Sequence, residues 1–441
     1  MAISAGATAY APGQAKTDYR AMSVATVLFF MWGFLTALND ILVPHLKSIF
    51  SLTNAEAALI QTAFFGAYFL FALPAGKLVE FRGYKQTMVI GLLVAAVGAL
   101  LFIPAAHSIS YPVFLGAMVV LAAGITLLQV AANPYVASIG PVGTASSRLN
   151  LSQAFNSLGT TVAPPLGSIL ILGAAAELTA AQFKALSPAA KSAYQAAQAS
   201  TVTTPYLVIA GLLVVLAIAL AAIKLERRQN LTVDYRPIPG FGGSIWQQKW
   251  LLLGAAGIFL YVGAEVSIGS FLISYFGRPE LGGIPAQTAG KLVAYYWGGA
   301  MVGRFLGSYI LTKVRTGTLL GLFAVIALLL VVTSMVTTGP VAMWSILAVG
   351  LFNSIMFPSI FTLGLAGLGD LTSKGSSLMV QAIVGGAILP WLYGKLADRI
   401  GYQHAFLIPA VCYVFIAVFG FAAARRLMVT DPRAGAPMEA I

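Results

Sequence analysis

Two carboxylates stand in stretches of the chain that otherwise avoid charge. Asp40 lies in TALNDILVPHL (36–46), directly after the apolar run AMSVATVLFFMWGFL, and Glu265 lies inside the apolar run that begins near residue 250. Burying a carboxylate in a bilayer is costly unless it faces a partner, a water-filled cavity or a proton. We therefore expect both residues to face a polar cavity between helices, where they could bind a substrate or a coupling ion. A structural hydrogen bond between helices is the alternative.

Neutral polar side chains occur in the same predicted helices. They are amides, which hydrogen-bond hydroxyl groups as carboxylates do: Asn39, Gln129, Asn133, Asn150, Gln153, Asn156, Asn353 and Gln381. In RLNLSQAFNS (148–157) three of them are spaced three apart and would form one stripe along a helix. An aromatic ring such as Trp297 could cover the C–H face of a sugar. Contacts that hold helices together are the alternative for the amides, and core or interface packing is the alternative for the ring.

Composition places these residues in a membrane protein. The chain has 441 residues, of which 59% are hydrophobic and 9% are charged, whereas soluble domains carry about 25% charged residues. The net charge of +12 comes without a basic block, which argues against nucleic acid as a partner. One cysteine and three scattered histidines provide no metal-binding spacing. No P-loop, G-x-S-x-G or H-E-x-x-H motif occurs, so we expect no catalytic residues, no cofactor and no ATP-driven pump.

Twelve stretches are long and apolar enough to cross a bilayer, which takes roughly 20 residues each. The predicted spans are 21–46, 57–79, 86–106, 111–138, 147–173, 203–224, 250–276, 288–311, 317–337, 341–368, 376–396 and 403–424. The predicted divisions of the chain are a tail (1–20), a first six-helix half (21–224), a linker (225–249), a second six-helix half (250–424) and a second tail (425–441). The predicted fold class is an all-α integral membrane protein.

Basic residues predict the orientation of these spans. With the first residue in the cytoplasm, seventeen lysines and arginines fall in cytoplasmic segments and seven fall in outer segments, while Arg304 lies inside a span. Cytoplasmic loops of membrane proteins carry the excess of basic residues. We therefore expect a multi-pass protein of the cell (inner) membrane with both termini in the cytoplasm.

The two halves show an internal repeat with an offset near 225 residues. The aligned pairs are Asp40 with Glu265, Gly76 with Gly303, Gln129 with Asn353, Pro134 with Pro358, Asn156 with Gln381, and Pro164 with Pro390. Six pairs in order, spread over five pairs of spans, indicate a duplicated unit. Two six-helix halves related by a repeat, with a site between them, are typical of the major facilitator superfamily.

The loop GKLVEFRGYKQ (76–86) resembles the gating loop of that superfamily. Gly76 would permit close packing of helices, Glu80 could meet a basic group, and Arg82 and Lys85 would lie at the surface. An ordinary charged loop is the alternative.

Two further features belong with this loop. Arg304 aligns near its first lysine and is expected to act at the inner gate or as an anchor, not in substrate binding. GKLADRIGYQ (394–403) looks similar to the loop, but the predicted topology places it on the outer side.

Longer motifs resemble one family of sugar transporters. LNDILVPHLKSIF, QTAFFGAYFLFALPAGKL, AANPYV, GPVGTASSRLNLSQAFNSLG and TPY are similar to the fucose–proton symporter family. The resemblance covers nearly all of the first six spans. It continues more weakly through YVGAEVSIGSFL and FPSIFTLG, in a form closer to the glucose/galactose and N-acetylglucosamine branches. It implies the major facilitator fold and sugar–cation symport.

The resemblance also implies roles for single residues. The family's sugar-recognising aspartate falls on Asp40, and an asparagine of its motif falls on Asn156. Its proton-carrying glutamate falls on Gln129, which cannot titrate, whereas Glu265 stands where the fucose branch has glutamine. Because carboxylate and amide are exchanged in this way, we expect Glu265 to be the coupling residue, with Asp40 as the alternative.

These expectations combine into one function. The chain is expected to take up a monosaccharide by cation symport with alternating access, driven by protons or, as the alternative, by sodium ions. It is expected to work as a monomer in the lipid bilayer. Drug efflux is disfavoured because the stripe in 148–157 is polar, and a sugar-sensing receptor without transport is the alternative from another class.

Overall fold

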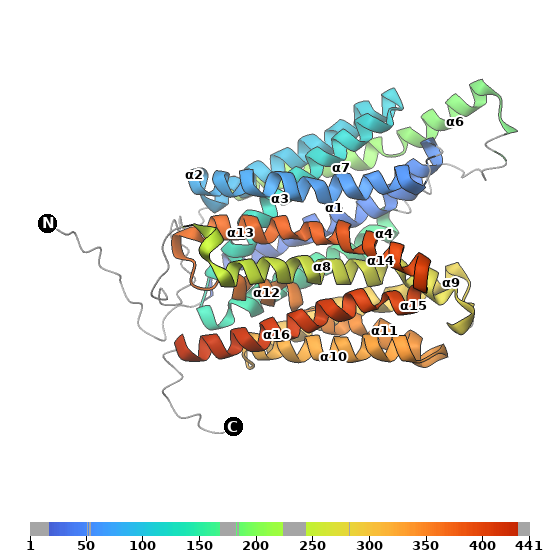
Figure 1. Ribbon diagram of the computed structural model, residues 1–441. Coiled ribbons are helices and arrows are strands. Elements are labelled where there is room, and N and C mark those ends of the chain that lie inside the picture. Colours follow the sequence, from blue (N-terminus) through green and yellow to red (C-terminus); the bar gives the residue numbers. More distant parts are fainter. Residues whose placement is uncertain are drawn as a thin grey trace.

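The structure is a computed structural model that describes residues 17–50, 52, 54–167, 182, 185–223, 244–281 and 283–430. All regular elements in these ranges are helices. Figure 1 shows long helices lying side by side in two groups, one built around α1, α2, α3 and α7 and the other from α8 to α16. We call the end of the bundle at which α16 finishes the terminal end (left in Figure 1), and the opposite end the far end.

The first half follows the predicted order with one addition. Its helices are α1 (Tyr19–Phe50), α2 (Asn54–Ser108), α3 (Tyr111–Ser138), α4 (Ala145–Gly167), α6 (Pro188–Ser200) and α7 (Thr203–Ala222). α1 begins where the Asp18 side chain accepts hydrogen bonds from the backbone N–H groups of Arg20 and Ala21, both at 3.0 Å, as a helix-capping residue does. α6 is the addition, because it lies between two predicted spans.

The second half is broken more often than the first. Its helices are α8 (Lys249–Phe276), α9 (Ala286–Ile310), α10 (Thr316–Val336), α11 (Gly339–Asn353), α12 (Met356–Leu365), α13 (Thr372–Gln381), α14 (Gly385–Ile400), α15 (Tyr402–Ala405) and α16 (Leu407–Thr430). The predicted span 341–368 is thus divided into α11 and α12, and the span 376–396 into α13 and α14.

The described helices cover each predicted span, fully or in part. Among the described residues, nine stretches are long and apolar enough to cross a membrane. One of them, Leu59–Ser108, holds two predicted spans, because Gly83 breaks α2 between them. α4 and α9 are not among the nine, since they carry polar side chains such as Gln153 and Arg304. Residues 168–173, the predicted end of the fifth span, lie outside the described residues.

Pro134 opens a backbone hydrogen bond that the other half uses. A proline within a helix has no N–H to donate to the carbonyl four residues earlier, which in α3 is the carbonyl of Val130. That oxygen accepts a hydrogen bond from Ser376 Oγ of α13 at 2.8 Å. The missing bond inside one helix therefore becomes a bond between the two halves.

Other polar contacts join the halves near the terminal end. Ser146 of α4 shares a hydrogen bond of 2.6 Å with Thr362 of α12. Glu80, in the gating-loop motif of α2, forms an ion pair with Lys374 of α13, with 3.6 Å between Oε1 and Nζ. Together with the Ser376 bond, these contacts close the terminal end of the bundle between the halves.

Arg148 holds the start of α4 in place. Its guanidinium donates to Val136 O at 3.2 Å, to Ala137 O at 2.5 Å and to Pro141 O at 2.8 Å. A cation at the last carbonyls of α3 also meets the negative end of the dipole of that helix. The polar stripe carried by α4 is thereby fixed relative to α3.

Two loops of similar sequence lie at opposite ends of the bundle. GKLVEFRGYKQ contains Gly83 at φ 80° and ψ 170°, and GKLADRIGYQ contains Gly401 at φ 84° and ψ 157°. This backbone conformation is open almost only to glycine. Just after Gly401, Gln403 donates to Thr337 O at 2.6 Å, at the far end of α10. The second loop therefore lies on the side opposite the gating loop, as the sequence topology predicts.

We predict that Gly83→Ala and Gly401→Ala each lower the free energy of unfolding by about 1–3 kcal/mol, because alanine is strained at these dihedral angles. Gly211→Ala is the matched control, since Gly211 lies inside α7 and, like the other two, has open space around its Cα. Thermal unfolding of the purified variants in detergent measures the effect. Equal melting temperatures for all three variants would contradict the prediction.

Candidate functional site

A buried ion pair lies between α8 and α9. Arg304 Nη2 is 3.7 Å from Glu265 Oε1, and only 13% and 12% of the two side chains, respectively, is exposed. At this distance the contact is an ion pair without a hydrogen bond. In the part of the chain that the structure describes, Glu265 Oε1 has no hydrogen-bond donor. Such an oxygen can receive a proton or a hydroxyl donor without losing an existing bond.

Arg304 connects this carboxylate to both halves. Its Nη1 donates to Ser157 Oγ of α4, in the first half, and its Nε donates to Ser354 O at 3.4 Å. The carbonyl of Ser354 is available because Pro358, which begins the next turn, has no N–H to give it. The break between α11 and α12 therefore positions the guanidinium. The structure places Arg304 in this interior ion pair, whereas the sequence alignment predicts an inner-gate or anchoring role.

Tyrosines support the backbone next to the ion pair. Tyr296 OH donates to Glu265 O at 3.1 Å and accepts from Asn353 Nδ2 at 2.9 Å. Tyr413 OH donates to Asn353 Oδ1 at 2.7 Å, and Tyr261 OH donates to Asn353 O at 3.1 Å. These tyrosines and Asn353 are buried. The Asn353 amide thus holds α9, α11 and α16 together instead of facing an open cavity.

The first half repeats one of these bonds. Gln129 Nε2 of α3 donates to Tyr68 OH of α2 at 2.9 Å, as Asn353 donates to Tyr296 in the second half. Gln129 is buried, with 8% of its surface exposed. The position that the family resemblance assigns to a proton carrier is therefore occupied by an amide engaged in a bond between helices.

The polar stripe of α4 makes contacts with two different helices. Asn150 Nδ2 donates to Arg304 O at 2.7 Å, and Asn156 Nδ2 donates to Phe29 O of α1 at 3.0 Å. Gln153 is buried between them. Asn150 and Asn156 therefore bind neighbouring helices in this conformation, and a sugar would have to share these amides or replace their partners.

Three other candidate residues lie in different surroundings. Asn133 is fully buried, and neither atom of its amide has a hydrogen-bond partner in the described part of the chain. Gln381 Nε2 donates to Phe69 O of α2 at 3.0 Å. Trp297 is 43% exposed and lies against α8 at Gly269. A direct sugar contact at Asn133 would require the surrounding helices to move.

Asn39 and Asp40 belong to helix α1, but their side chains lie outside the described residues. Their assignment to the sugar site stays a prediction. Among the residues that the structure describes, no group of three or more histidine, cysteine, aspartate or glutamate side chains could hold a metal ion.

The predicted gating loop lies at the terminal end. A side chain at Gly76 would collide with Ser377 of α13, so the two helices approach this closely only because residue 76 is glycine. Lys85 Nζ donates to Ala221 O at the end of α7, at 2.8 Å, and Arg82 is exposed. The loop thus contacts both its own half and the opposite one.

Sequence reasoning missed the tyrosines of the site and Ser157. Tyr68 and Tyr296 lie 228 residues apart, close to the repeat offset, so extending the alignment to them would have found the recurring amide–tyrosine bond. No comparable signal marks Tyr261 or Tyr413, because aromatic residues are common throughout such helices.

Two transporters are similar to this chain over nearly its whole length, and a family model also matches. The Major Facilitator Superfamily model matches residues 23–382. The glucose/galactose transporter of Brucella abortus biovar 1 (strain 9-941) is 51% identical over 403 residues, which cover 91% of this chain and 93% of the relative. The L-fucose-proton symporter of Escherichia coli (strain K12) is 35% identical over 418 residues, which cover 92% of this chain and 94% of the relative.

A solved structure is similar to the fold. The crystal structure of the transporter FucP in the outward conformation superimposes with a TM-score of 0.83 at 32% identity, and the match covers 91% of this chain and 98% of that one.

We predict that Tyr296→Phe lowers the free energy of unfolding by about 1–3 kcal/mol, because it leaves the buried Asn353 amide and the Glu265 carbonyl without a partner. Tyr295→Phe is the matched control, since the neighbouring Tyr295 is 60% exposed. Thermal unfolding of both variants in detergent measures the difference. The network would be unimportant if the two variants melted together with the unmodified protein.

Proposed function

We infer the function from one premise, which is that the chain belongs to the Major Facilitator Superfamily. It is a secondary active transporter that takes up a monosaccharide by proton symport with alternating access. The observation that carries the coupling is the buried Glu265–Arg304 pair, whose arginine also contacts the opposite half through Ser157. Sodium coupling is the second candidate.

The sugar that we propose is a hexose of the glucose and galactose type. The relative that is 51% identical bears the name of these sugars, whereas the relative that is 35% identical bears the name of L-fucose. Asp40 and Asn39 of α1, with Gln153 and Asn156 of α4, supply the groups that would bind sugar hydroxyls from the first half. Glu265 would add a carboxylate from the second half.

The orientation follows from the basic residues. Seventeen of them lie in the segments assigned to the cytoplasm and seven in the outer segments, so both termini and the terminal end are assigned to the cytoplasmic side of the cell membrane. The contacts of Ser146, Glu80 and Ser376 close that side. The conformation described here would then be open toward the outside, the state named for FucP.

Coupling would work through the charge of Glu265. While ionised, the carboxylate attracts Arg304 across 3.7 Å, which keeps the guanidinium between α8, α12 and α4. A proton on Glu265 removes that attraction. Arg304 could then release Ser157, and the halves could rearrange around a bound sugar without carrying an unpaired charge through the bilayer.

Gating would use the contacts at the terminal end. Opening the cytoplasmic side requires the Glu80–Lys374 ion pair and the close packing of Gly76 on Ser377 to separate. Both contacts join α2 to α13, so these two helices are the ones that would part. The chain is proposed to complete this cycle as a monomer, since each half supplies part of the site.

We predict that proteoliposomes of the purified protein accumulate D-glucose or D-galactose when the outside is made acidic. For one proton per sugar, a gradient of one pH unit sustains up to about a tenfold accumulation, because each corresponds to about 1.4 kcal/mol. Labelled L-fucose and N-acetylglucosamine are compared in parallel, and a sodium gradient at constant pH replaces the proton gradient in a further arm. Failure of all four sugars to accumulate would contradict sugar symport, and accumulation on sodium alone would assign the coupling ion to sodium.

We predict that Glu265→Gln abolishes accumulation on a proton gradient and leaves exchange of labelled for unlabelled sugar within about threefold of the unmodified rate, since exchange needs no net proton movement. The control is Asp370→Asn, which removes an exposed carboxylate outside the site and should leave both rates unchanged. Persistent proton-driven accumulation in the Glu265 variant would remove this residue from the coupling step.

A further inference from the structure

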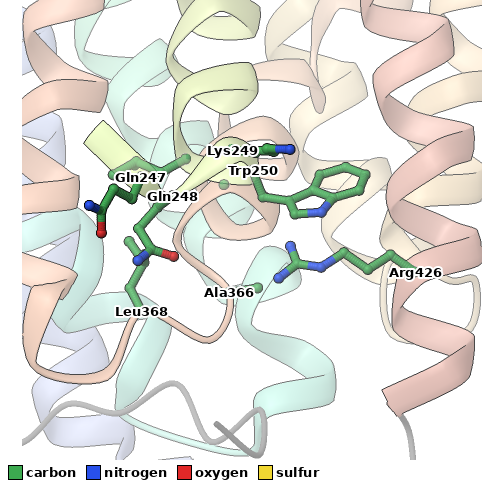
Figure 2. Close-up of a pocket in the computed structure, with 9 residues that line it drawn as sticks. Gln247, Gln248, Lys249, Trp250, Ala366, Leu368 and Arg426 are labelled. Carbon is green, nitrogen blue, oxygen red and sulfur yellow. The ribbon is translucent and has the colours of Figure 1, made fainter. Parts of the chain in front are cut away.

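A second polar site lies at the terminal end of the second half, away from the ion pair of Glu265 and Arg304. It is a pocket of about 220 Å³ between the short helix η3 (Ile245–Gln247), the start of α8, the segment that follows α12, and the end of α16. Figure 2 shows this arrangement. Its volume is below the roughly 300–1,000 Å³ of pockets for drug-sized ligands, so it suits a small group.

The charges that line the pocket are all positive. Lys249 begins α8, and Arg426 reaches the pocket from α16, with its guanidinium carbon 4.8 Å from the centre of the Trp250 ring. No acidic residue is among the residues that line it. Two cations without a lining carboxylate favour an anionic ligand, and a guanidinium matches the oxygens of a phosphate in particular.

Gln248 adds an independent sign of a ligand. Only 7% of this residue is exposed, yet its side chain makes no hydrogen bond to the described residues and does not cap α8. Figure 2 shows the Gln248 amide pointing into the pocket, on the side that the Arg426 guanidinium approaches. A buried amide without a partner is costly unless a ligand or water completes its hydrogen bonds.

The start of α8 favours the same ligand. The first backbone N–H groups of this 28-residue helix have no acceptors within the helix, and the helix dipole makes that end attractive to anions. The helix end, the two cations and the unpartnered amide therefore converge on one small volume.

The place of the pocket indicates where the anion comes from. Trp246, in η3 beside the pocket, is 63% exposed, and tryptophan is enriched at the level of lipid head groups. Basic pockets at the cytoplasmic ends of membrane helices bind anionic lipid head groups. We propose that this pocket binds the phosphate of an anionic phospholipid through Arg426, Lys249, Gln248 and the start of α8.

Native mass spectrometry of the full-length protein tests the proposal. Purified protein is exchanged into detergent that contains phosphatidylglycerol or phosphatidylcholine, and the fraction of molecules that retain lipid is measured. The unmodified protein should retain phosphatidylglycerol preferentially. Arg426→Gln and Lys249→Gln should each reduce that retention about fivefold, the usual contribution of one basic residue at an anionic membrane surface.

Arg425→Gln is the matched control. It removes the same charge from the adjacent residue of α16, which is exposed and does not line the pocket, and it should retain lipid within about twofold of the unmodified protein. Lys249→Gln keeps the test valid if Arg426→Gln fails to fold. Equal retention by all three variants, or no preference for phosphatidylglycerol, would overturn the proposal.

A thermal-shift arm separates the two sources of phosphate. Glycerol 3-phosphate and inorganic phosphate are added at millimolar concentration to lipid-free protein. A shift with phosphatidylglycerol that free phosphate does not reproduce supports a lipid head group. A shift with free phosphate, lost in Arg426→Gln, and no effect of the lipid would overturn the lipid assignment in favour of a soluble phosphate.

Discussion

A buried carboxylate that depends on one arginine is the constraint from which the rest of the site follows. Glu265 Oε1 has no hydrogen-bond donor in the described part of the chain and is held only by the charge of Arg304 at 3.7 Å. A buried charge without its partner is strongly destabilising, whereas the intact pair adds little net stability. Such a pair is therefore better understood as a switch than as a support. The surroundings serve to keep the guanidinium within reach, through the Ser354 carbonyl that Pro358 leaves free.

The same arginine makes the switch a matter for both halves. Because Arg304 also donates to Ser157 of α4, and its own carbonyl accepts from Asn150, the charge state of a residue in one half bears on its contact with the other. The first half contains the matching amide–tyrosine bond, between Gln129 and Tyr68, but at that place it has an amide instead of a titratable group. The internal repeat thus supplied two similar frames, and charge was placed in only one of them.

How much of this could be read from the sequence depends on the range of the interactions. The spans, the glycine-containing loops and the polar stripe of α4 are local patterns, and each occurs where the pattern predicts it. The partner of Glu265 could not be predicted, because Arg304 lies 39 residues away and reaches it only through the packing of α9 on α8. Helix α6 was missed because its sequence, PAAKSAYQAAQAS, is too polar to be recognised as a span. The amides of Asn150, Asn156 and Asn353 were predicted to bind sugar, and in this conformation they bind neighbouring helices.

The central claim is that Glu265 changes its protonation state when sugar binds. Infrared difference spectroscopy of the purified protein measures this directly, because a protonated carboxylic acid has a C=O stretching band that a carboxylate lacks. The account predicts that adding the transported sugar near neutral pH changes the intensity of this band, that the band shifts in D2O, and that Glu265→Gln removes the change. A sugar-induced band that is unaltered in the Glu265→Gln protein would show that another group takes up the proton and would contradict the account.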